Sequence, residues 1–252
     1  MTSWLQWARD AVAARTPMPI THVVAVRHIE SRAVVNRRRR VVAVTSVLGA
    51  GVLGASLRAS PGSTRFYVLT LGAAVTWTVG GMTSGPLHLG WIESRDRSLR
   101  RPVLVPIATG VAAFGFFYGC ALVARRIPFL DSAISRVLVF AEEGNIPLVL
   151  LTTYANGIGE EVFFRGALYA ALPRNRAVVA STVVYSAATT TTRNPALVLA
   201  AGVMGALFAL QRRASGGLQA PLLTHVTWST LMVRYLPPLF PHVRDDAPET
   251  RA

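Results

Sequence analysis

The sequence contains no lysine and a single cysteine, so all 26 of its basic side chains are arginines. With only Cys120, one chain can form neither a disulfide framework nor a cysteine-based metal site. Charge is scarce as well, because charged residues make up 15% of the 252 residues and hydrophobic residues 52%. A water-soluble domain of this size would have too little polar surface, and a lipid bilayer removes that difficulty. The composition therefore predicts a membrane protein.

The excess of arginine over the 12 acidic residues gives a net charge of +14, which would also suit a nucleic-acid partner. However, the sequence does not interleave basic and aromatic residues, and its arginines lie at the ends of apolar blocks. Arginine in that position anchors a chain at the membrane surface, so we expect the lipid bilayer as partner and no nucleic acid. The lack of lysine and the abundance of alanine and valine indicate a GC-rich bacterial genome. We therefore expect a multi-pass protein of a bacterial inner membrane.

Seven apolar blocks have about the length that a helix needs to cross a hydrocarbon core of about 30 Å. A shorter segment of mixed polarity, 131–140, is typical of a helix at the membrane interface. We predict an all-α fold, a polytopic transmembrane helical bundle of about seven spans over residues 41–240, with no soluble second domain. The seven blocks are 41–57, 66–87, 102–124, 146–172, 177–192, 196–210 and 217–237.

Both ends of the chain are polar. Residues 1–40 are rich in arginine and amphipathic, and they include the run Arg37–Arg40 directly before the first block. This segment is expected to be an N-terminal arm on the membrane surface. Arginine is more frequent in alternate loops, which places the N-terminus in the cytoplasm by the positive-inside rule. The polar tail 241–252 is expected to be disordered.

The fourth block contains charges that do not suit a lipid-exposed span, namely Glu160, Glu161 and Arg165. Each such group costs roughly 2.5–3.5 kcal/mol at the centre of a membrane. Glu161 and Arg165 are four residues apart and can pair on one helix face, whereas Glu160 is turned about 100° away. Two interpretations follow. Glu160 is available as a general base, or all three groups form one ion network that locks helices together.

A second polar pair lies in the seventh block, where His225 and Ser229 are four residues apart and can share a helix face. A single histidine within a span can serve simply as a hydrogen-bond donor between packed helices. Since Glu160 and His225 are both ionisable and lie in different blocks, one shared polar site explains the two together more simply.

The order and spacing of these residues resemble the intramembrane CPBP proteases, a family named for CAAX proteases and bacteriocin-processing enzymes and also called Abi. The family pattern is EExxxR, then FxxxH, then HxxxN or HxxxD. The first motif is complete from Glu160 to Arg165, and the third is half kept from His225 to Ser229. The second is degenerate, because Tyr185 and Thr189 stand where phenylalanine and histidine are expected. The resemblance covers about residues 100–240.

The resemblance implies a role for each matching residue in peptide hydrolysis. Glu160 would be the general base for a water molecule, and His225 would position that water or donate a proton. Ser229 would be a weak substitute donor toward the oxyanion. Glu161 and Arg165 would hold the site together.

The resemblance also raises two questions: whether Thr189 can replace the histidine of the second motif, and whether the site holds a metal. Thr189 would be a supporting residue only, since its hydroxyl does not titrate near neutral pH and cannot replace a histidine. The family has been described as metalloproteases, yet a catalytic zinc needs three protein ligands, and Glu160 and His225 supply two. The sequence has no HExxH pair to supply more. We predict neither a tightly held metal nor another cofactor.

Three classes of function therefore stay open. The leading one is a CAAX prenyl protease-like intramembrane endopeptidase that acts on a peptide or a membrane-protein segment. The alternative is a non-catalytic CPBP-family protein, a scaffold, binder or immunity factor, because the second-motif histidine is replaced by Thr189. A transporter or channel would use the buried carboxylate for ion movement, but the internal repeat typical of such proteins is not evident in the sequence.

Overall fold

The computed structural model describes residues 6, 30–93 and 98–241 of the chain. Residues 242–252 of the predicted tail and the larger part of the predicted N-terminal arm lie outside these residues. The described part is built from helices, with one short antiparallel pair of strands in which Ile92 faces Arg100. The all-α class predicted from the sequence is confirmed.

The elements follow one another along the chain with short connections. The first half contains α3 (Arg32–Ser56), α4 (Thr64–Thr83), β1 (Ile92–Glu93), β2 (Leu99–Arg100), α5 (Leu104–Ala124) and α6 (Pro128–Glu142). The second half contains α7 (Ile146–Glu160), the π-helical segment η1 (Glu161–Leu168), α8 (Tyr169–Ala171), α9 (Ala177–Thr189), η2 (Thr190–Thr192), α10 (Pro195–Ser215), α11 (Gln219–Tyr235) and η3 (Pro237–Leu239).

Each of the seven apolar blocks coincides with a helix or with consecutive helical segments. The block 102–124 is α5, and the block 146–172 is one long run of α7, η1 and α8. Among the described residues, three helices are long and apolar enough to cross a membrane: Thr64–Ser84, Leu104–Ala124 and Pro195–Ser215. The count of seven spans goes beyond these three and stays a prediction.

Side-chain caps at the predicted boundaries explain why several helices begin where they do. The side chain of Ser63 accepts a hydrogen bond from a backbone N–H of the first turn of α4, and Asn145 does the same for α7. Asn194 caps α10 through two such bonds, and a proline follows it directly. These caps satisfy amide groups that have no partner within the helix.

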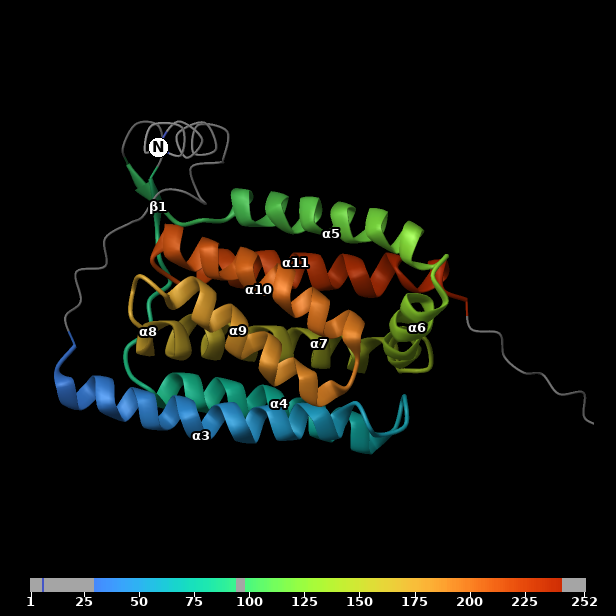
Figure 1. Ribbon diagram of the computed structural model, residues 1–252, viewed down its shortest axis with the longest axis horizontal. Helices are drawn as coiled ribbons and strands as arrows, with labels where there is room; N and C mark the ends of the chain where they lie inside the picture. The colour runs from blue at the N-terminus through green and yellow to red at the C-terminus, as the bar shows by residue number, and fades with distance from the viewer. Residues whose placement is uncertain (1–5, 7–29, 94–97, 242–252) are drawn as a thin grey trace, which may run out of the picture.

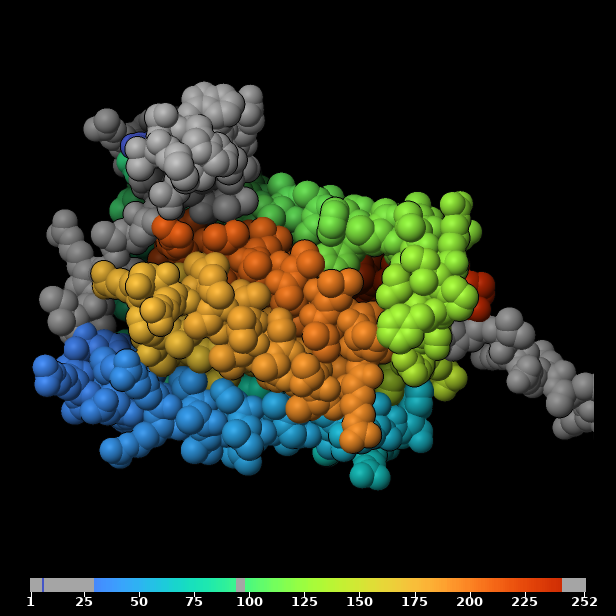
Figure 2. Space-filling view, in the orientation of Figure 1, coloured from blue at the N-terminus to red at the C-terminus, as the bar shows by residue number. Residues whose placement is uncertain are grey.

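The helices lie side by side along the long axis of the molecule, with α3 and α4 at one edge and α5 with α11 at the opposite edge (Figure 1). Helix α7 contacts both α4 and α11, and α9 packs against α10. In Figure 2, α9 and α10 cover one broad face of the bundle, in front of α7. The charged fourth block is therefore at the centre of the bundle.

The exterior is more apolar than that of a water-soluble protein, and several polar side chains are buried. Large apolar side chains such as Val47, Leu104 and Val179 are exposed, whereas Glu160, Glu161 and several other polar residues are buried. An apolar exterior of this extent needs an apolar surrounding. Together with the three apolar helices, it identifies a membrane protein.

The arginine-rich run before the first block is part of α3, which begins at Arg32. Arg38 is fully buried there and forms an ion pair with Glu30, and its guanidinium also donates to the hydroxyl of Ser84 at 3.1 Å. Nε of Arg39 donates to the carbonyl oxygen of Ala171 at 3.4 Å. These contacts join the start of α3 to the ends of α4 and α8 at one end of the bundle.

Candidate active site

The two acidic residues of the first motif lie at a change of helix type. Glu160 is the last residue of α7, and Glu161 is the first residue of the π-helical segment η1. Wider helical turns of this kind occur often at functional sites. Behind η1, the rings of Phe163 and Phe164 pack on Trp77 of α4, each with its centroid 4.9 Å from the indole. This aromatic packing fixes the segment that carries both carboxylates.

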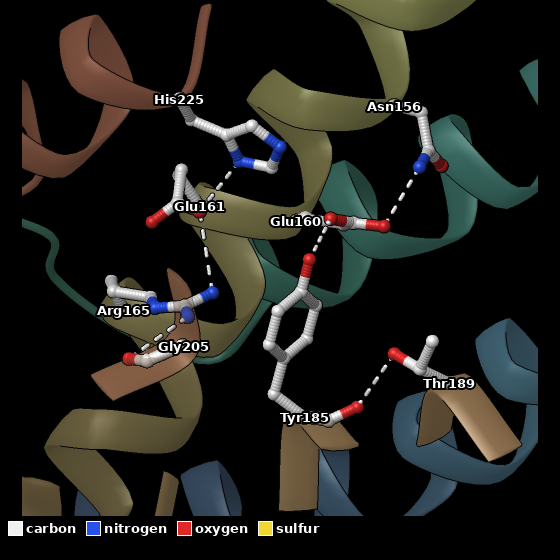
Figure 3. Close-up of polar contacts among 8 residues, drawn as sticks. All are labelled: Asn156, Glu160, Glu161, Arg165, Tyr185, Thr189, Gly205 and His225. Carbon is white, nitrogen blue, oxygen red and sulfur yellow. Dashed lines mark hydrogen bonds and ion pairs between the residues drawn. The ribbon is translucent and has the colours of Figure 1, made fainter. Parts of the chain in front are cut away.

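Glu161 is the centre of a buried network. One of its oxygens, Oε1, accepts a hydrogen bond from Arg165 at 3.2 Å and lies 2.9 Å from Nδ1 of His225 (Figure 3). The guanidinium of Arg165 also donates to the carbonyl oxygen of Gly205 at 3.3 Å. The predicted pairing of Glu161 with Arg165 is therefore confirmed, and the network joins η1 to α10 and α11.

Glu160 points away from that ion pair. Its Oε1 accepts a hydrogen bond from the amide of Asn156 at 2.7 Å, and its Oε2 accepts one from the hydroxyl of Tyr185, also at 2.7 Å. The side chain is 6% exposed. Helical geometry predicted its separation from Glu161, but it did not predict two donors on the carboxylate.

His225 has its ring fixed from two sides. Phe208 stacks on it with a centroid distance of 4.8 Å, and Nδ1 contacts Glu161. If Nδ1 carries the proton that Glu161 accepts, Nε2 keeps its lone pair. Nε2 lies beside Gly157 of α7, 3.5 Å from where a β-carbon would stand. The glycine therefore leaves room at this nitrogen, one turn before Glu160.

Ser229 and Thr189, the two predicted hydroxyl residues of the site, lie on different helices. Ser229 is buried on α11, one turn after His225. Thr189 is buried on α9, and its hydroxyl donates to the backbone carbonyl of Tyr185 at 2.9 Å. The hydroxyl of Thr189 is thus bonded to its own helix, and α9 contacts Glu160 through Tyr185.

Four participants in these networks were not predicted from the sequence. Asn156 could have been found, because it lies four residues before Glu160 and the same spacing rule applies. Tyr185 occupies the first position of the second motif, where the family pattern has a phenylalanine without a hydroxyl. Gly205 and Arg212 carried no signal: the first contributes a backbone carbonyl, and the second donates through Nε to the carbonyl oxygen of Arg165 at 2.8 Å.

The donor set does not fit a three-ligand zinc site. Among the described residues, no group of three or more histidine, cysteine, aspartate or glutamate side chains is placed so that it could hold a metal ion. Glu161 Oε1 already contacts two cationic or hydrogen-bonding partners, and Glu160 accepts from an amide and a phenol. A metal would have to displace several of these bonds.

Comparison with known proteins bears on this segment of the chain. Residues 142–231 match the family model described as Type II CAAX prenyl endopeptidase Rce1-like. The match runs from the end of α6 into α11 and includes Glu160, Arg165, Thr189, His225 and Ser229. No curated protein and no solved structure gives a significant match. The resemblance to the CPBP family is therefore confirmed, and over residues 142–231 the chain is similar to the type II CAAX prenyl endopeptidases.

Proposed function

We propose that the protein is a CPBP-type intramembrane endopeptidase, which hydrolyses a peptide bond with a water molecule activated by glutamate and histidine. One observation carries the proposal: α7 and α11 each contribute a buried ionisable side chain, Glu160 and His225, within the segment that matches the family. Glu161 joins the two helices by its contact with His225. Packing alone gives little reason to bury so many ionisable groups in a membrane protein.

In this proposal Glu160 is the general base. The attacking water transfers a proton to the carboxylate as its oxygen adds to the scissile carbonyl carbon. Burial of Glu160 supports this role, since it keeps bulk water away from the carboxylate. Its carboxylate is also left free of Arg165, whose guanidinium pairs with Glu161 among the described residues.

His225 is proposed to act through Nε2. Glu161 accepts at Nδ1 and so sets which ring nitrogen is available, as carboxylates do for histidines in other hydrolases. Nε2 would accept a hydrogen bond from the water and so position it, and the proton that Glu160 takes from the water would then pass to the leaving amine. Arg165 compensates the charge of Glu161, and Ser229 would donate weakly toward the oxyanion. Thr189 would support the fold of α9 without taking part in proton transfer.

The substrate in this proposal is a peptide or a membrane-protein segment that enters from the bilayer. The arginine-rich end of the bundle, where α3 begins, is proposed to face the cytoplasm of a bacterial cell. The name of the matching family suggests a prenylated peptide, and a leader peptide or transmembrane segment has the same peptide bond to offer.

Peptide cleavage by the purified protein tests the proposal. The protein in liposomes is incubated with a prenylated peptide, a leader peptide and a transmembrane peptide, and products are identified by mass spectrometry. Glu160→Gln is expected to abolish cleavage, whereas Glu143→Gln, the same change on an exposed residue at the end of α6, leaves it intact. Cleavage that persists in Glu160→Gln would remove Glu160 from the mechanism.

A non-catalytic membrane protein, acting as scaffold, binder or immunity factor, is the second candidate. It is favoured by Thr189, whose hydroxyl is bonded to its own helix, and by the two hydrogen bonds that already occupy Glu160. The variant Thr189→His separates the two candidates. If the parent cleaves none of the peptides and the variant does, the natural protein is a pseudoenzyme.

A further inference from the structure

The contact between Tyr185 and Glu160 has no part in the mechanism above. The phenol oxygen lies 2.7 Å from Oε2 of Glu160, and the two residues are 25 positions apart on different helices. Tyr185 is 9% exposed and Glu160 is 6% exposed. A hydrogen bond from a hydroxyl to a buried carboxylate is charge-assisted and stronger than one between neutral groups.

The ring of Tyr185 cannot turn away easily, because it is held on several sides. The ring of Phe164 lies 4.7 Å away, and the guanidinium carbon of Arg165 lies 4.5 Å from the ring centroid. Both neighbours belong to η1, the segment that follows Glu160. The backbone of Tyr185 is held as well, since its carbonyl oxygen accepts from Thr189.

The two donors on Glu160 come from different places. Asn156 is on the same helix, one turn earlier, and therefore moves with Glu160. Tyr185 is on α9, so it fixes the carboxylate relative to a second helix. Together they determine the rotation of the carboxylate plane, and with it the lone pairs that remain for a water molecule.

We propose that Tyr185 is a positioning residue for Glu160, and that α9 acts on the site through this hydroxyl. The effect of Tyr185 on catalysis rests on the proposed function, whereas the hydrogen bond between Tyr185 and Glu160 does not depend on it. The phenol stabilises the anionic carboxylate without an ion pair and, together with Asn156 on Oε1, limits a water molecule to the lone pairs that stay free. When Glu160 takes up a proton, the hydroxyl of Tyr185 stays bonded to Oε2, and no proton leaves the phenol.

The variant Tyr185→Phe tests the proposal, because it removes the hydroxyl and keeps the ring between Phe164 and Arg165. The matched control is Tyr154→Phe, which removes a hydroxyl that accepts from Thr230 at 3.2 Å instead of contacting Glu160. In the cleavage assay, kcat is expected to fall about tenfold in Tyr185→Phe with KM unchanged, as for loss of one charge-assisted hydrogen bond. The control is expected to keep the parent values.

An infrared measurement separates this inference from the proposed function. The carboxyl band of Glu160 is the one that disappears in Glu160→Gln, and it is expected to shift in Tyr185→Phe and to stay in place in Tyr154→Phe. If the parent cleaves nothing, the endopeptidase proposal fails, and the band alone decides the role of Tyr185. A band that does not move, or a parent-like kcat in Tyr185→Phe, overturns the inference.

The design also covers a variant that does not fold. In that event 3-fluorotyrosine is inserted at position 185, which keeps the ring and the hydroxyl but makes the hydroxyl a stronger donor. The Glu160 band is then expected to shift in the direction opposite to the loss of the bond. An unchanged band contradicts the proposal here too.

Discussion

Nδ1 of His225 lies 2.9 Å from Oε1 of Glu161, although 64 positions separate the two residues in the chain. The same oxygen accepts a hydrogen bond from Arg165, so one atom joins η1 to α11. The second glutamate of the motif is thus a structural anchor for the histidine, while the first faces different partners. We therefore expect substitution of the two glutamates to change the stability of the fold by different amounts.

Replacement of Glu161 by glutamine is expected to destabilise the fold. Arg165 and Glu161 are 1% and 0% exposed, and a buried cation left without its carboxylate costs about 3 kcal/mol. Unfolding in mixed micelles with a denaturing detergent measures the change. Glu160→Gln keeps the ion pair, so the free energy of unfolding should fall by less than half as much. Equal losses in the two variants would contradict the division.

Gly159 is expected to be a second sensitive position. A β-carbon there would stand 2.7 Å from the backbone oxygen of Ala74, so Gly159→Ala forces α7 away from α4. We expect a loss of about 1–3 kcal/mol in stability, as for overpacking in a core. Gly51→Ala is the control, because no atom outside the adjoining backbone of its own helix lies within 4 Å of the added carbon. Comparable thermal unfolding of both variants would count against this close packing.

The helices could be predicted from the sequence to within a few residues. The block 102–124 corresponds to α5 (Leu104–Ala124). An uninterrupted apolar run of that length crosses a membrane as a helix, because a helix satisfies its own backbone hydrogen bonds in lipid. The boundary at residue 40 was less successful, since α3 begins at Arg32. Arginine favours helix well enough to continue one, so a run of it does not mark a helix end.

The site was predicted in part. The contact of Glu161 with Arg165 follows from spacing along one helix, and it was found. The contacts of Glu160 with Tyr185 and of Glu161 with His225 depend on how separate helices are rotated and paired, which one sequence does not specify. The π-helical segment that begins at Glu161 also could not be predicted from the residue types it contains.

Arg212 is predicted to stabilise η1 from the side. Its Nε donates to the carbonyl oxygen of Arg165 at 2.8 Å, and its guanidinium lies 5.2 Å from the ring centroid of Tyr169. Arg212→Met leaves that carbonyl without this donor, so we expect a loss of about 1–3 kcal/mol in the free energy of unfolding. Arg213→Met, at the exposed neighbour, is expected to change it by less than about 0.5 kcal/mol.

The orientation of the bundle in the membrane is open to a direct test, because the chain has one cysteine. In a Cys120→Ser background, Arg213→Cys marks the arginine-rich end and Arg126→Cys marks the end where α5 stops. Both arginines are exposed. By the positive-inside rule, a membrane-impermeant maleimide added outside intact cells should label position 126 and leave position 213 unlabelled.

The labelling test has its own controls. Cys120→Ser alone should take up no label, and opening the cells should make position 213 reactive as well. The reverse pattern, with position 213 labelled from outside, would place the arginine-rich end on the external side. The positive-inside rule would then fail for this protein, and the start of α3 with its buried Arg38 would face away from the cytoplasm.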